Sequence, residues 1–320
     1  MKTKNIQKLF LIALSVFLFT SCKKEADNIF NMFTDVTVTY NNSDPRCVTD
    51  YKLVNDKDEV WIDFTINSAK EDMFSYVVET SAGTQQPTRI TTPITDGTKR
   101  RTFSNIIKMT MNRDGKSSFR VYALNEKGIY IGDGYKKVTV EVNPSFMIYA
   151  NRDIYLPDTV GKVLPSFFSL SDATSYSYSN GAANSGKIDF GIYRTMYLDA
   201  QRVTQYAINL YNTSAPSTTF PIYDVSTWQK RLTKFSAPVA SQGTVFLTGA
   251  ISGSTVEALA KARTINLNNT VATTAAAGLA ANSAVFFLTP EGKYGMMLVN
   301  QVTADINKKP YINVSIKVQR

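Results

Sequence analysis

Short segments in which apolar and polar residues alternate recur in the first half of the chain. Alternation with a period of two places one face of a β-strand against a core and the other in water. The pattern occurs six times, at 36–40, 60–66, 74–78, 103–109, 119–123 and 138–142. Turn signals rich in Asn, Asp and Gly separate the segments. The pattern therefore predicts a β-sandwich over residues 31–143.

One of these segments resembles a known family. It is similar to the penultimate strand and following turn of fibronectin type III and related immunoglobulin-like domains, through Phe119, Val121, Ala123, Asn125 and Gly128. The sequence departs from that family at Ser117, where a corner tyrosine is frequent. The resemblance implies an immunoglobulin-like fold for the sandwich. It assigns the domain no ligand, because a fold alone does not specify a function.

The pattern becomes mixed after Pro144, a residue type that ends a strand ladder. We expect strands at 166–170, 174–178 and 187–193, an extended segment at 244–247, an ambiguous segment at 206–212, a short helix at 228–235, and a loop or weak helix at 266–282. Ser254 and Glu257 form a capping-box pattern at the head of a helix that runs to Ala262.

The clearest pattern lies in the last 40 or so residues, where strands and a turn alternate. Segments 284–289 and 294–302 flank a Pro-Glu-Gly-Lys turn and predict a β-hairpin, and 311–318 predicts a further strand. Residues 146–320 are therefore expected to form an α+β domain with a largely antiparallel sheet, and the whole chain is expected to be mainly β.

Residues 1–22 have the pattern of an export signal. Three lysines precede an apolar run at 9–19, which is too short to span a bilayer but fits the apolar region of a signal peptide. The ending Phe19-Thr20-Ser21-Cys22 resembles a bacterial lipobox, whose cysteine is acylated and becomes the new N-terminus. Two or three acyl chains would hold the protein stably on a membrane. The charged segment 23–30 then predicts a flexible tether.

Two further resemblances indicate where the chain resides. The charged residues after Cys22 are similar to the stretch that directs Bacteroidota lipoproteins to the outer face of the outer membrane. The C-terminal part resembles uncharacterised two-domain Bacteroidota surface lipoproteins, through Lys187, Ile188, Asp189, Phe190, Phe287, Thr289, Gly292, Lys293, Gly295 and residues 316–319. The resemblance implies an outer-membrane location, lipid-anchored and surface-exposed, and no activity.

Composition removes several classes of chemistry. The chain has no histidine, so mechanisms that use Ser-His-Asp or Cys-His groups are impossible. It has two cysteines, and a lipid on Cys22 leaves no second cysteine for a disulfide with Cys47. The net charge is +9, and three of these charges belong to Lys2, Lys4 and Lys8 of the leader. The remaining basic residues occur in short groups such as Lys308-Lys309, which are typical of solvated turns and not of a nucleic-acid surface. We expect no metal, cofactor or nucleic-acid partner.

The carboxylates and aromatic residues after residue 146 give only weak candidates. No local motif selects a pair of carboxylates for hydrolysis, so we expect no enzymatic activity; Asp189 is expected to point outward by alternation with Ile188 and Phe190. Aromatic rings stack on sugars, and the candidates for such a role are Trp228, Tyr176, Tyr178 and, in the sandwich, Trp61. Ordinary packing of these rings is the favoured alternative.

Three functions remain open on the sequence. The first is a non-enzymatic, membrane-anchored surface lipoprotein that binds an extracellular polymer, with a glycan as the preferred ligand. The second is a cell-adhesion or assembly subunit that contacts another surface protein, which a large exposed apolar patch would favour. The third is a hydrolase built on two carboxylates in one cleft.

Lipidation of Cys22 gives the first testable prediction. Cells that express the wild-type chain should incorporate a clickable fatty acid into it, and Cys22→Ser should abolish that label because the acylated thiol is gone. Cys47→Ser is the matched control and should keep the label. Label retained in Cys22→Ser would contradict the assignment.

Overall fold

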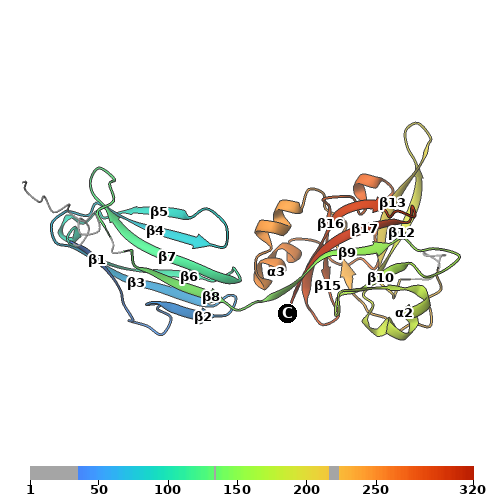
Figure 1. The fold of residues 1–320 in the computed structure, drawn as a ribbon, viewed down its shortest axis with the longest axis horizontal. Helices are drawn as coiled ribbons and strands as arrows, with labels where there is room; N and C mark the ends of the chain where they lie inside the picture. The colour runs from blue at the N-terminus through green and yellow to red at the C-terminus, as the bar shows by residue number, and fades with distance from the viewer. Residues whose placement is uncertain (1–34, 133–134, 216–222) are drawn as a thin grey trace, which may run out of the picture. The chain divides into compact units, whose positions relative to one another are not determined.

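A computed structural model describes residues 35–132, 135–215 and 223–320 (Figure 1). Cys22, the leader and most of the tether lie outside the described residues. The structure is mainly β, with 46% strand and 12% helix, which confirms the expected fold class. Within the described part of the chain, no helix has the length and apolar character needed to cross a membrane.

Contacts divide the chain into two compact units. Among the described residues, the first comprises 35–50 with Trp61–Ile107 and Ser118–Thr139, and the second comprises Tyr51–Val60, Lys108–Ser117 and Val140–Arg320. The second unit thus includes residues 51–60, 108–117 and 140–143, which the sequence pattern assigned to the sandwich. The expected domain limits of 31–143 and 146–320 remain a prediction, although the sheets do separate near residue 144.

Residues 36–142 form two sheets of a sandwich-like fold. One has the order β1-β3-β6 and the other β2-β8-β7-β4-β5. The strands are β1 (Val36–Tyr40), β2 (Tyr51–Val54), β3 (Glu59–Ser68), β4 (Ser75–Ala82), β5 (Thr88–Pro93), β6 (Thr102–Thr110), β7 (Gly115–Leu124) and β8 (Lys137–Val142). All six predicted strands are present, with Val60, Ile62 and Phe64 buried on one face of β3 as alternation requires. Strands β2 and β5 carry little burial and were not predicted.

Residues 146–319 form two more sheets. The first has the order β14-β15-β16-β17-β9 and the second β11-β10-β12-β13, and every pairing in them is antiparallel. Their strands are β9 (Phe146–Tyr155), β10 (Pro165–Ser169), β11 (Thr174–Ser177), β12 (Phe190–Leu198), β13 (Thr204–Tyr211), β14 (Lys234–Phe235), β15 (Ala284–Leu288), β16 (Tyr294–Ala304) and β17 (Pro310–Gln319). The predicted hairpin at 284–302 and the strand that follows it are confirmed.

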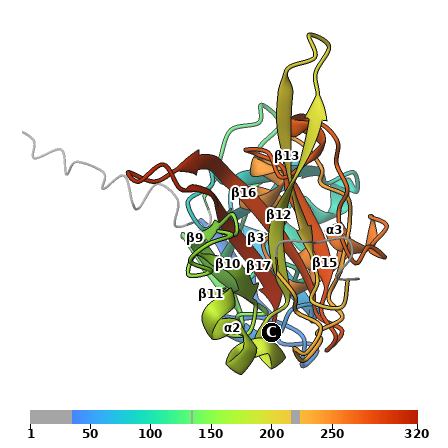
Figure 2. The same ribbon diagram turned by 90° about the vertical axis from the view of Figure 1, so that its right-hand side faces the viewer.

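Three layers build this part of the molecule. A core that includes Phe168, Phe190, Val285 and Ile316 lies between the two sheets. On the other face of β15 and β16, helix α3 (Gly253–Lys261) packs through Val256 and Ala260, among others. Two short helices, α2 (Tyr178–Asn184) and the adjoining 3-10 turn Ser185–Lys187, connect β11 to β12. Figure 2 shows the β12–β13 hairpin continuing beyond the rest of its sheet.

Some local predictions are wrong for identifiable reasons. Residues 228–235 form no helix; they hold a bend and irregular chain followed by β14, whose Phe235 enters the core. The segment expected to be extended at 244–247 belongs to a π-helical turn, Val245–Gly249. The buried Lys317 ammonium donates to the Phe246 carbonyl of this turn and to the Ala250 carbonyl that follows it. Helix α3 begins earlier than predicted because Ser252 is its N-cap and Thr255 completes the capping box, in place of Ser254 and Glu257.

The packing of Phe287 on Gly295 gives a stability prediction. A Cβ at Gly295 would lie 2.1 Å from Phe287 Cζ and 2.8 Å from the Lys317 carbonyl oxygen. Gly295→Ala should therefore lower the free energy of unfolding by about 1–3 kcal/mol. The measurement is urea unfolding followed by Trp228 fluorescence in a Trp61→Phe background. Gly97→Ala is the control, since nothing lies within 4 Å of its Cβ position; equal effects of the two changes would contradict the prediction.

Candidate functional site

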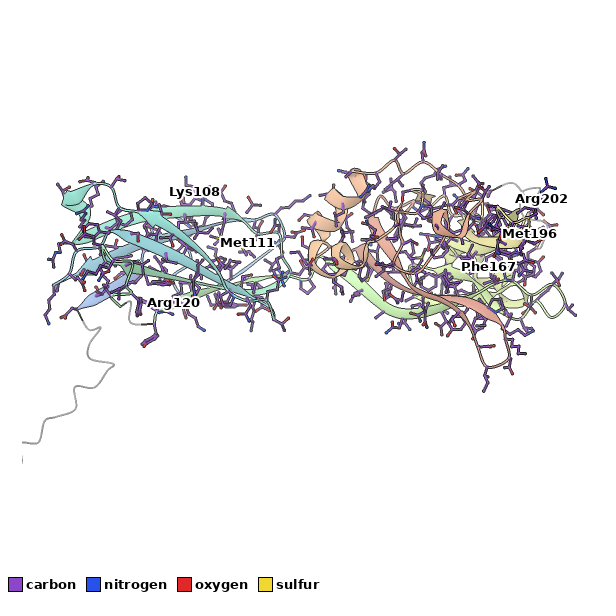
Figure 3. The ribbon with its side chains drawn as sticks, turned by 90° about the horizontal axis from the view of Figure 1, so that it is seen from above. Lys108, Met111, Arg120, Phe167, Met196 and Arg202 are labelled. Atoms are coloured by element: carbon purple, nitrogen blue, oxygen red, sulfur yellow. The ribbon has the colours of Figure 1, made fainter. Side chains whose placement is uncertain are left out.

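The expected aromatic candidates belong to a packed cluster. Trp228 is only 6% exposed; its ring centroid lies 4.8 Å from that of Phe167 and 5.5 Å from that of Tyr178. A Cβ at Gly181 would lie 2.2 Å from Trp228 Cη2, so α2 covers the indole. The burial of Trp228 agrees with ordinary packing, the alternative that the sequence favours over a sugar-stacking role. Figure 3 places Phe167 among the side chains of the second unit.

The other three rings are held by their neighbours. Tyr178 stacks on Tyr223 with ring centroids 4.6 Å apart, and its hydroxyl donates to the Asp224 carbonyl. Tyr176 is half-buried and donates to Asp172 at 2.8 Å. In the sandwich, the Arg46 guanidinium lies 3.8 Å from the ring centroid of Trp61. None of these arrangements presents a row of open rings.

Asp189 is buried, which corrects the outward orientation expected from alternation. Its side chain is 0% exposed and accepts hydrogen bonds from Leu170 N at 2.7 Å, Thr233 Oγ1 at 2.8 Å and Arg231 Nε at 2.8 Å. Burial raises the pKa of Asp189, and these hydrogen bonds oppose that shift. The residue precedes β12, at the end of a 3-10 turn, so strand alternation does not apply to it.

Arg231 also binds a second carboxylate. Its terminal nitrogen lies 2.8 Å from Glu291 Oε1 in the turn between β15 and β16. The guanidinium thus stands between Asp189 and Glu291, which compensates both charges. No group of three or more His, Cys, Asp or Glu residues capable of holding a metal occurs in residues 35–132, 135–215 and 223–320. The Asp189 cluster is a structural link between the sheets.

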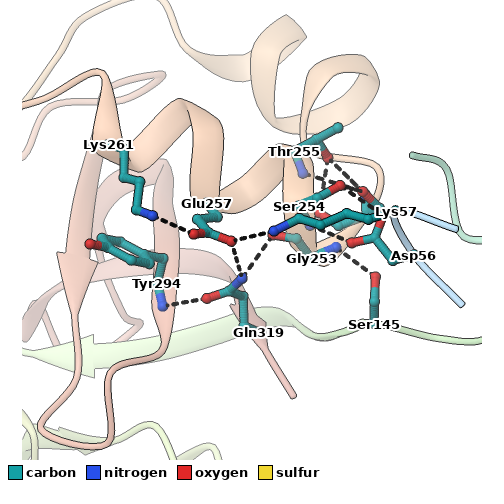
Figure 4. Close-up of polar contacts among 11 residues, drawn as sticks. Asp56, Lys57, Ser145, Gly253, Ser254, Thr255, Glu257, Lys261, Tyr294 and Gln319 are labelled. Atoms are coloured by element: carbon teal, nitrogen blue, oxygen red, sulfur yellow. Dashed lines mark hydrogen bonds and ion pairs between the residues drawn. The ribbon is translucent and has the colours of Figure 1, made fainter. Parts of the chain in front are cut away.

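A second polar network surrounds the N-terminus of α3 (Figure 4). The Asp56 carboxylate accepts from the Ser254 amide at 2.6 Å and from its hydroxyl at 2.7 Å, and Ser145 Oγ accepts from the Gly253 amide at 2.6 Å. Carboxylate and hydroxyl oxygens here satisfy amides that a helix N-terminus leaves without intrahelical partners. Glu257, one turn further along α3, is bound by Lys57, Lys261 and Gln319. The polar groups of this network therefore form hydrogen bonds and ion pairs with one another.

A groove at the base of the β12–β13 hairpin has a different character. One cavity of about 340 Å³ is mostly aliphatic, with Leu156, Ile208, Leu279 and Val302 in its lining. A second cavity of about 450 Å³ is lined by Asp158, Lys308 and Lys309, among others. Both cavities are lined by Leu156, Arg194 and Pro310, so the two lie next to each other. We call the pair the distal groove.

The hairpin carries apolar side chains from the groove into solvent. Met196 is 71% exposed, Leu198 is 65% exposed and Tyr206 is 43% exposed. Met196 lies opposite Tyr206 in the register, and Arg194 lies over the Tyr206 ring at 4.4 Å. Residues 194, 196 and 198 share one face by alternation. Figure 3 shows Met196 together with Arg202 at the hairpin.

Family models and curated proteins give no match to this chain.

Sequence reasoning missed the residues of the distal groove and hairpin. Alternation from Arg194 to Leu198, followed by a turn at Asp199 and a second extended segment, was a signal for a hairpin. That pattern does not indicate which face of the hairpin is exposed to water. Lys308 and Lys309 were interpreted as a solvated turn; they lie in a turn, and they also line the distal groove.

Glu257 gives a prediction for pH. Hydrogen bonds from Lys261 and Lys57 lower its pKa to about 2. A carboxylate with a lowered folded-state pKa stabilises the fold above its unfolded pKa, and the stabilisation is lost as pH falls through the folded value. Glu257→Gln should therefore lower the free energy of unfolding by up to about 1 kcal/mol at pH 6, and the difference should shrink towards zero near pH 2.

The measurement is urea unfolding of both proteins between pH 6 and pH 2, followed by Trp228 fluorescence in the Trp61→Phe background. Glu126→Gln, in an exposed turn, is the control and should cause no pH-dependent difference. A Glu257→Gln difference that stays constant down to pH 2 would contradict the assignment.

Proposed function

We propose that this chain is a non-enzymatic, lipid-anchored surface protein that contacts another surface protein through the β12–β13 hairpin. The observation that carries the proposal is the exposed apolar strip formed by Met196, Leu198 and Tyr206, with exposures between 43% and 71%. Isolated exposed apolar residues are ordinary, but a contiguous strip beside an aliphatic cavity is typical of an interaction site. The proposed location is the outer membrane, with the lipid on Cys22 as the anchor.

Glycan binding is the second candidate. Arg194 stacked on the half-exposed Tyr206 ring, next to a cavity, is an arrangement that favours a sugar. We rank it second because the other candidate rings are buried or engaged, and the cavity beside Tyr206 has an aliphatic lining. Glycan-array binding that is lost in Tyr206→Ala would reverse this ranking.

No specific observation favours a hydrolase. Among the described residues that line the distal groove, Asp158 is the acidic one, and its oxygens accept from backbone amides and the Tyr223 hydroxyl.

In-cell photo-crosslinking tests the proposal. A photoreactive amino acid at Thr204, on the hairpin, should give a defined protein adduct in intact producing cells. The double variant Met196→Asp, Leu198→Asp should reduce that adduct by about tenfold or more, because it puts charges into an apolar contact.

The matched control is Ile90→Asp on β5, which is 68% exposed and so comparable to the two hairpin residues. It should leave the adduct unchanged. An adduct of equal intensity in the double variant, or the absence of any hairpin adduct, would overturn the proposed contact.

A further inference from the structure

The distal groove combines an aliphatic half with a cationic half, and the combination specifies the chemistry of its ligand. We infer that the docking segment of the partner is an acidic, extended polypeptide that places an apolar side chain in the aliphatic cavity and carboxylates against Arg194, Lys308 and Lys309. The inference rests on the proposed function and adds the chemical class of the partner.

The positive charge of the groove is available to a ligand. Arg194, Lys308 and Lys309 are all exposed, and no carboxylate of the described residues forms an ion pair with them. Arg194 lies over the Tyr206 ring and also lines both cavities of the groove. Three cations that line the same cavity therefore favour an anionic ligand.

The one carboxylate of the groove does not cancel this charge. Asp158 accepts hydrogen bonds from Leu164 N at 3.0 Å, Val163 N at 3.3 Å and Tyr223 Oη at 3.2 Å. Burial raises the pKa of Asp158, but these amide and hydroxyl contacts outweigh burial and hold the pKa below its ordinary value. The carboxylate is therefore ionised and organises its own loop.

The two lysines are held in place by their turn. Asp305 Oδ1 accepts from the Lys309 amide at 2.8 Å and from the Asn307 amide at 2.9 Å, and the Asp305 carbonyl accepts from the Lys308 amide. Lys308 adopts a φ of 60°, a left-handed conformation that this turn imposes. The ammonium groups thus project from an ordered backbone, which lowers the entropic cost of binding.

The aliphatic half supplies the other part of the recognition. Leu156, Ile208 and Leu279 give the cavity an apolar wall, while Arg194 belongs to both halves. A strand with apolar and acidic residues in alternation or in close succession presents, within a few residues, an apolar side chain for the aliphatic half and a carboxylate for the cationic half. A polyanion without apolar groups would leave the aliphatic cavity unfilled.

The test uses the purified full chain and a fluorescein-labelled dodecapeptide of alternating Glu and Val, followed by fluorescence anisotropy. The wild type should bind it, and binding should weaken with added salt. The triple variant Arg194→Glu, Lys308→Glu, Lys309→Glu should lose about tenfold or more in affinity. That variant should in turn prefer an alternating Lys–Val peptide. Such a reversal would show that the loss of Glu–Val binding comes from the changed charge and not from misfolding.

The control triple variant is Arg263→Glu, Lys127→Glu, Lys137→Glu. It makes the same change of net charge with the same residue types at exposed positions outside the distal groove, and it should bind like the wild type. Equal losses in the two triple variants would show long-range charge only and overturn the inference. So would equal binding of a Gln–Val peptide, or binding to phosphatidylglycerol vesicles in place of the peptide.

These outcomes separate the two proposals. If the wild type does not bind the Glu–Val peptide while the hairpin adduct remains dependent on Met196 and Leu198, the acidic-partner inference fails and the proposed function stands. If the adduct is independent of the hairpin, the proposed function fails whatever the peptide binds.

Discussion

The buried carboxylate of Asp189 is the constraint on which the arrangement of the second unit depends. An ionised group without exposure to water must be compensated within the protein, or the fold is destabilised by several kcal/mol. Three elements supply that compensation: the end of β10 through the Leu170 amide, the segment before β14 through Thr233 and Arg231, and, through Arg231, the β15–β16 turn at Glu291. One side chain therefore connects the two sheets, and β12 starts from this fixed point.

This anchoring of β12 fixes the position of the β12–β13 hairpin. β12 is anchored by Asp189, just before its first residue, and its Phe190 and Ile192 pack in the core. From Arg194 onward the strand alternates between exposed and half-buried residues. Its exposed half and the facing half of β13 carry the strip of Met196, Leu198 and Tyr206. Loop contacts on the opposite face, from Thr195 to the Ala272 carbonyl and from the Ala275 amide to Tyr197, orient the hairpin further. An interaction surface on such a support is pre-organised, which reduces the entropy lost on binding.

Sequence patterning predicted the strands well wherever one face is buried and the other is wet. It failed for β2 and β5, which are the two edge strands of their sheet and carry few buried residues. It also failed for Val245–Gly249, where hydrogen bonds from Lys317 override the local preference for an extended chain. Asp189 was misplaced because Ile188, Asp189 and Phe190 are all buried, a situation that no period-two pattern represents. The distal groove joins residues near 156, 194, 280 and 309, and only the folded chain brings these together.

The place of β17 in its sheet has a consequence for the order of folding. β17 lies between β16 and β9, so β9, formed by residues near 150, has no neighbour in that sheet until residues 310–319 have been synthesised. Contacts between segments so distant along the chain are slow to form, because the entropy of closing the intervening loop is lost before the contacts contribute any stability. The sheet is thus completed late. Strand order alone makes its completion wait for the C-terminal strand, since β9 has no other partner in it.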